Sequence, residues 1–186
     1  MSGLPASSTQ RADGVGFVPL KTPPGVLGEI VARKRQDLPS ILAKAAKTRD
    51  LRPFAPSVPD PTVRWKAFAD GLRGGRHGAP RLIAEVKPRS PSRGVLVGDG
   101  SIPAMLAQAE RYRGHASVVS VLCDGPYFGG SLDLLRAVAD ALDCPVLCKD
   151  FVISRGQIGA AAEAGAGAVL LMASLLPRAS LRELLT

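Results

Sequence analysis

The chain has 186 residues and a formal net charge of +8, with 46% hydrophobic but only 4% aromatic residues. This length suits one domain with a substantial core. No apolar run reaches the roughly eighteen residues of a transmembrane helix, so we expect no membrane span. The N-terminus also lacks the basic and apolar regions of a secretory signal. We therefore expect a cytoplasmic protein.

The excess positive charge lies in residues 1–82, which hold 14 Lys/Arg against 6 Asp/Glu, whereas residues 83–186 hold 10 of each. Much of it comes from "VARKRQD" at 31–37 and "AAKTRDLR" at 45–52, whose spacing is typical of solvated helix faces. A nucleic-acid surface would interleave basic residues with aromatic ones, which these stretches do not. We expect no nucleic-acid partner, and an anionic small molecule suits the charge better.

The cysteines Cys123, Cys144 and Cys148 have no metal-ligand spacing. Cys144 and Cys148 flank "PVL" in a predicted strand, where four extended residues separate their Cα atoms too far for a disulfide. We interpret all three as small, buried, reduced side chains and predict no metal site.

Residues 1–24 contain Gly, Pro and Ser without periodicity and are predicted to be a flexible tail. From Val26 apolar residues recur at helical spacing, and Pro39 is expected to end or kink this first helix. A proline-rich connector and a short helix follow. Residues 25–81 are therefore predicted to be a helical extension and connector.

From residue 82 onward, apolar strands alternate with helices. The predicted strands are 82–87, 117–122, 145–151 and 168–173, and the predicted helices are 102–113, 131–142, 155–164 and 180–185. This alternation indicates a parallel sheet covered by helices. Four such units in residues 82–186 fit either an open doubly wound sheet or part of a (β/α)8 barrel.

The first strand carries two ionisable residues on one face, because Ile83, Glu85 and Lys87 alternate with Ala84 and Val86. Charges in a strand that is covered on both faces are costly unless they are paired or functional. A buried Glu–Lys ion pair is one interpretation. The position of Lys87 at the carboxyl end of the strand favours the other, since α/β folds build active sites there.

The third strand repeats this arrangement, with Leu147, Lys149 and Phe151 on one face and Lys149 near the carboxyl end. Two strand-end lysines and a carboxylate suit acid–base chemistry on an anionic carbonyl compound. Clustered cations lower one another's pKa, so an ammonium can donate a proton near neutral pH.

The segment "IAEVKPRSPSRG" at 83–94 closely resembles the first-strand signature of the indole-3-glycerol phosphate synthase family of tryptophan biosynthesis. Residues 120–138 and 145–176 resemble the second to fourth units of that family, and "VLGEIVARKRQDL" at 26–38 resembles its extra N-terminal helix. The resemblance extends from Val26 to Leu176 and rests mainly on the E-x-K-x-x-S-P-S and K-D-F elements.

The resemblance implies a TIM (β/α)8 barrel, of which this chain holds the first four units. It also implies a lyase that closes, decarboxylates and dehydrates 1-(2-carboxyphenylamino)-1-deoxyribulose 5-phosphate without a cofactor or metal. Lys149 corresponds to the lysine that protonates the substrate carbonyl, Lys87 to the second catalytic lysine, and Glu85 to the carboxylate that orients both.

The resemblance further implies substrate-binding residues. Ser90 lies in the first βα loop, and Phe128 and Phe151 match aromatic positions that surround the anthranilate ring.

A complete barrel takes about 250 residues, and the chain stops within its fourth predicted helix, so we expect a partial synthase. A second interpretation is a catalytically inactive half-barrel that associates with itself or another chain through exposed edges. A third is another phosphosugar barrel enzyme, such as the isomerase one step earlier in the pathway. The synthase-specific signature disfavours the third.

Overall fold

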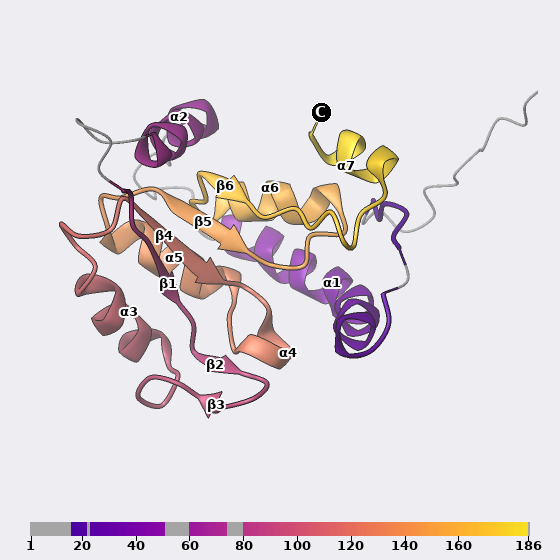
Figure 1. Ribbon diagram of the computed structural model, residues 1–186, viewed down its shortest axis with the longest axis horizontal. Helices are drawn as coiled ribbons and strands as arrows, with labels where there is room; N and C mark the ends of the chain where they lie inside the picture. The colour runs from indigo at the N-terminus through magenta and orange to yellow at the C-terminus, as the bar shows by residue number, and fades with distance from the viewer. Residues whose placement is uncertain (1–15, 22, 51–59, 74–79, 186) are drawn as a thin grey trace, which may run out of the picture.

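The computed structural model describes residues 16–21, 23–50, 60–73 and 80–185 (Figure 1). A parallel sheet lies at its centre, in the spatial order β1 (Ile83–Val86), β4 (Val118–Leu122), β5 (Val146–Lys149) and β6 (Ala168–Val169). Spatial order therefore follows chain order, as in successive units of a barrel. The predicted parallel βα architecture is confirmed, and the four strands show none of the order reversal of a doubly wound sheet.

Three helices follow the strands and pack on one side of the sheet (Figure 1): α3 (Ile102–Glu110), α5 (Leu132–Ala141) and α6 (Arg155–Glu163). Each begins at a serine whose side chain accepts a backbone N–H, as expected for a helix N-cap. Between sheet and helices lies an apolar core that includes Val86, Val121, Leu134, Leu135, Val138 and Cys148. The apolar side of the strands is thereby covered, which leaves their polar positions on the other side.

Several element boundaries differ from the sequence predictions. β6 has two residues rather than the six predicted, and α7 (Arg178–Leu185) begins before residue 180. Two small elements were not predicted at all: the hairpin of β2 (Arg89–Ser90) with β3 (Gly94–Val95), and the one-turn helix α4 (Gly125–Phe128). These pieces are too short to show any hydrophobic periodicity.

Helix α1 (Val26–Asp50) is a single 25-residue helix with Pro39 inside it. Of the two predicted effects of Pro39, an end of the first helix is therefore wrong, and a kink remains a prediction. The helix packs into a second apolar cluster on both sides of this proline, through Val31 and Leu38 before it and Leu42 after it. Packing of this kind offsets the hydrogen bond that proline removes. A separate helix, α2 (Pro61–Leu72), begins at the N-cap Asp60.

Residues 16–21 lie within the segment predicted as a flexible tail, yet they pack against the body of the chain. Val18 N donates to Ile153 O at 3.0 Å, Lys21 N donates to Leu175 O at 2.9 Å, and Val18 is 1% exposed. The tail prediction therefore does not hold for these residues. A short extended segment has no periodic pattern by which sequence could reveal it.

The second cluster joins α1 to the loops that follow β5 and β6, since Val31 and Leu38 pack with Ile153, Leu175 and Leu176. Figure 1 shows α1 running beside α6. No helix within the described ranges is long and apolar enough to cross a membrane. Helix α1 is thus packed directly against the loops at the carboxyl ends of β5 and β6.

Candidate active site

Three charged side chains meet beside the sheet. Glu85 Oε1 lies 2.5 Å from Lys87 Nζ, and Glu85 Oε2 lies 2.5 Å from Lys149 Nζ. We call these residues the Glu85 group. The prediction that the three side chains share one face of the sheet is confirmed, because one carboxylate bonds both ammonium groups.

The sheet register explains why residues 64 positions apart meet. Glu85 lies opposite Ser120 of β4, and Ser120 lies opposite Leu147 of β5. Lys149 is the last residue of β5, and Lys87 directly follows β1. Because parallel strands end at the same edge of a sheet, both lysines reach the carboxylate from strand ends, where α/β folds place active sites.

The Glu85 group is partly open to solvent. The exposed fractions of the side chains of Glu85, Lys87 and Lys149 are 29%, 33% and 40%. The group can therefore be reached by a small molecule, and its two cations against one anion favour an anionic one.

Electrostatics keep the Glu85 carboxyl group in its charged form. Burial raises the pKa of this carboxyl, but hydrogen bonds from Lys149 and Lys87 and their charges outweigh burial and hold the pKa below its ordinary value. Glu85 is therefore ionised at neutral pH. An ionised carboxylate accepts hydrogen bonds, and Glu85 accepts one from each of the two lysine side chains.

Two predicted aromatic residues lie together near the strand ends. The ring centroids of Phe128, at the end of α4, and Phe151, two residues after Lys149, are 6.2 Å apart with an interplanar angle of 36°. This is a favourable tilted arrangement for an aromatic pair. Both rings are half-buried. The structure thus brings an apolar surface close in the chain to Lys149.

Ser90 lies in the β2–β3 hairpin, in the loop after β1. Its hydroxyl accepts a hydrogen bond from Arg93 N at 3.2 Å, within its own turn. No hydrogen bond recorded among the described residues joins Ser90 to the Glu85 group. This loop nevertheless packs closely against the end of α4. Gly129, the C-cap of α4, has a φ of +69°, and a Cβ added there would lie only 3.0 Å from the Arg89 side chain. The loop that carries Ser90 therefore packs beside α4, which holds Phe128.

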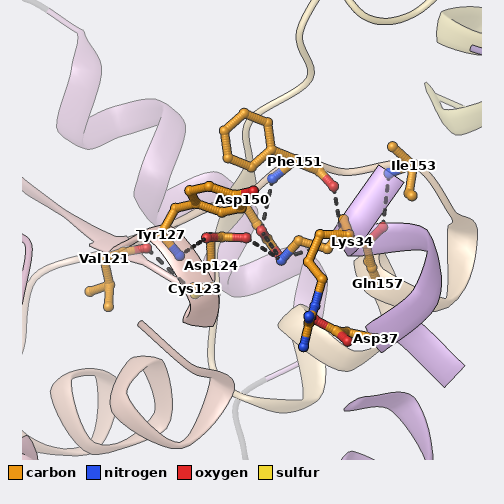
Figure 2. Close-up of polar contacts among 11 residues, drawn as sticks. Lys34, Asp37, Val121, Cys123, Asp124, Tyr127, Asp150, Phe151, Ile153 and Gln157 are labelled. Atoms are coloured by element: carbon orange, nitrogen blue, oxygen red, sulfur yellow. Dashed lines mark hydrogen bonds and ion pairs between the residues drawn. The ribbon is translucent and has the colours of Figure 1, made fainter. Parts of the chain in front are cut away.

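Sequence reasoning missed a second charged cluster, which Figure 2 shows. Lys34 was interpreted as part of a solvated helix face, and this was wrong, because the residue is 2% exposed. Its Nζ lies 2.9 Å from Asp124 Oδ1 and 2.7 Å from Asp150 Oδ1. Helical spacing could have indicated that Lys34 is buried. The residue lies four positions after Ile30, three after Val31 and four before Leu38, and these three apolar residues form the buried face of the helix.

The cysteines are free. The side-chain hydrogen bond with Cys148, together with burial, raises the pKa of Cys123 well above its ordinary value, so this residue stays a neutral thiol. Within the described part of the chain, no three His, Cys, Asp or Glu side chains are grouped so as to hold a metal ion.

Comparison with known proteins identifies the family of the chain. The indole-3-glycerol phosphate synthase family matches residues 27–186. The chain belongs to this family. It is 40% identical over 159 residues to the indole-3-glycerol phosphate synthase of Chlorobium luteolum, and 39% identical over 160 residues to that of Albidiferax ferrireducens. Each alignment covers 86% of this chain and 58% of the relative.

A third relative is the indole-3-glycerol phosphate synthase of Geobacillus kaustophilus, 38% identical over 159 residues, which are 86% of this chain and 55% of that protein. The chain thus spans a little over half the length of these relatives. Indole-3-glycerol phosphate synthases are TIM barrels, and the four parallel strands in chain order are consistent with a part of such a barrel.

The lowered pKa of Glu85 predicts how stability depends on pH. The stabilisation is complete above the ordinary carboxyl pKa of 4.5 and is lost as pH falls through the lowered value of the folded state. Glu85→Gln should therefore lower Tm at pH 7, and the gap from the parent should shrink as pH falls below about 4.5. Thermal melts from pH 7 to pH 3 measure this.

Glu29→Gln, at an exposed position in the first turn of α1, is the matched control and should change Tm little at pH 7. A Tm gap for Glu85→Gln that stays constant or widens on acidification would contradict the lowered pKa.

Proposed function

We propose that the protein to which these residues belong is an indole-3-glycerol phosphate synthase. It would convert 1-(2-carboxyphenylamino)-1-deoxyribulose 5-phosphate to indole-3-glycerol phosphate by ring closure, decarboxylation and dehydration. The observation that carries the proposal is the Glu85 group, in which one ionised carboxylate holds two strand-end ammonium groups at 2.5 Å. Membership of the family supports it.

The chemistry needs an acid where Lys149 lies. In ring closure an aromatic carbon attacks a ketone, and negative charge develops on the ketone oxygen. An ammonium within hydrogen-bond reach stabilises that charge and delivers the proton. Glu85 fixes the Lys149 ammonium in place, and its second oxygen holds Lys87, which we assign to binding of substrate anions and to proton transfer.

We assign the remaining predicted residues to substrate binding. Phe128 and Phe151 would form an apolar wall for the anthranilate ring, and their mutual contact supports this assignment. Ser90 would contribute a hydroxyl from the neighbouring loop. The proposed enzyme acts on a small phosphosugar in the cytoplasm, without a cofactor, metal or nucleic-acid partner.

A second candidate function follows from exposed apolar side chains on the strands. Ile83 is 47% exposed, and Leu170, which follows β6, is 36% exposed. Such residues favour association with further strands of a barrel or with another chain. A catalytically inactive half-barrel that works by association is therefore the alternative to the enzyme.

Lys149→Met tests the proposed acid. Methionine keeps most of the side-chain length but removes the charge and the proton, so kcat should fall by about 10²–10⁴-fold while the variant still folds. Steady-state kinetics on the complete enzyme measure the effect. Lys66→Met, at an exposed lysine of α2, is the matched control and should keep kcat. Near-normal turnover by Lys149→Met would move the acid role to Lys87.

A polypeptide of residues 1–186 alone tests the expectation that turnover needs groups outside these residues. It carries the Glu85 group but spans only a little over half the length of the relatives, so we expect negligible turnover and self-association. Light scattering on the purified chain and an assay with the carboxyphenylamino substrate measure both. Robust turnover by a monodisperse monomer would contradict this assignment of essential groups.

A further inference from the structure

Lys34 lies in a buried polar network that reaches from the N-terminal extension to the ends of two strands (Figure 2). Its Nζ pairs with Asp124 and Asp150, and the exposed fractions of the three side chains are 1%, 2% and 12%. We call Lys34, Asp124, Asp150 and Gln157 the Lys34 network. One cation against two carboxylates leaves a net charge of −1 away from water.

Asp124 connects Lys34 to the aromatic residue Phe128. It is the N-cap of α4: its Oδ2 accepts Tyr127 N at 3.0 Å, while its Oδ1 faces Lys34. The backbone oxygen of Asp124 also accepts a hydrogen bond from Gly130 N at 2.8 Å. This bond joins the residues on either side of α4. The position of Phe128, the last residue of α4, therefore depends on how Asp124 is held.

Asp150 connects Lys34 to the turn that follows Lys149. Its Oδ1 accepts Phe151 N at 2.8 Å, and its Oδ2 accepts Gln157 Nε2 at 3.3 Å. The same Gln157 nitrogen donates to Phe151 O at 3.1 Å, and Gln157 Oε1 accepts Ile153 N at 2.8 Å. The chain on the carboxyl side of Lys149 is therefore fixed by side chains that converge on the buried ammonium.

The network is charged at neutral pH. Burial lowers the pKa of Lys34, but Asp150 and then Asp124 outweigh burial and raise it above its ordinary value. The stabilisation that comes from this raised pKa is complete below the unfolded-state value and is lost only as pH rises through the folded-state value. Buried ion pairs give little net stability over apolar packing. Stability alone therefore does not explain why these charged side chains are buried here.

We propose that Lys34 is a positioning residue for the Glu85 group and the aromatic pair. Through Asp150 it fixes the backbone that carries Lys149 and Phe151, and through Asp124 it fixes α4 and Phe128. It touches none of the reacting atoms itself. The extension helix α1 is thereby coupled to the reaction site by one ion-paired side chain. The kinetic part of this inference rests on the proposed function, and the structural part does not.

Three variants test it. Lys34→Met removes the cation and leaves two unpaired buried carboxylates, which can prevent folding. The double variant Lys34→Met/Asp124→Asn restores the net charge of −1 and keeps a good N-cap. Lys34→Arg keeps the charge and the fold, but the planar guanidinium cannot reproduce the compact ammonium contacts. Lys47→Met, at an exposed lysine of the same helix, is the matched control.

Two readouts separate positioning from stability. NMR of the Lys149 side chain, through its 13Cε and 15Nζ resonances, reports the ion pair with Glu85, and kcat reports the reaction. We expect the folded Lys34 variants to shift the Lys149 resonances and to lose about 10- to 100-fold in kcat. The double variant should regain Tm relative to Lys34→Met without regaining kcat. Lys47→Met should match the parent in the Lys149 resonances, in kcat and in Tm.

The outcomes are decisive for the fold-retaining variants. If Lys34→Arg and the double variant keep both the parent Lys149 resonances and the parent kcat, Lys34 acts on stability alone and the inference is overturned. If the parent enzyme has no turnover of the proposed substrate, the proposed function fails. The Lys149 resonances then still decide the positioning role, because they need no substrate.

Discussion

The bridge from Glu85 to two lysines is the interaction on which the site depends. Without an ionised carboxylate between them, the ammonium groups of Lys87 and Lys149 would repel each other in a half-buried place. Each carboxylate oxygen takes one lysine at 2.5 Å, so two strands separated by β4 present their charges at one point. The parallel register of β1, β4 and β5 makes this possible.

A second charged cluster lies close by along the chain. Lys149 belongs to the Glu85 group, whereas the next residue, Asp150, pairs with Lys34 of α1. Alternation of side chains at a strand end can send neighbouring residues to different sides. Lys149 and Asp150 thereby join a partly open site to a buried network. In our proposal the Lys34 network holds the side chains of the site in position.

The residues of the site were predictable where a strong local rule applied. Alternation along two strands predicted that Glu85, Lys87 and Lys149 share a face. Lys34 was missed because its neighbours Arg33 and Arg35 make a basic run look solvated; only its spacing from Ile30 and Leu38 indicates burial. The packing of Phe17 and Val18 depends on a distant loop, so no local pattern could reveal it.

The central claim is that Glu85 works through the lysines that it holds, and a double-mutant cycle tests it most directly. The kcat values of the complete enzyme, Glu85→Gln, Lys149→Met and the double variant give the coupling between the two residues. If Glu85 acts by orienting Lys149, adding Glu85→Gln to Lys149→Met should cost much less than it does in the parent. Equal losses in both backgrounds would contradict the account, because Glu85 would then act independently of Lys149.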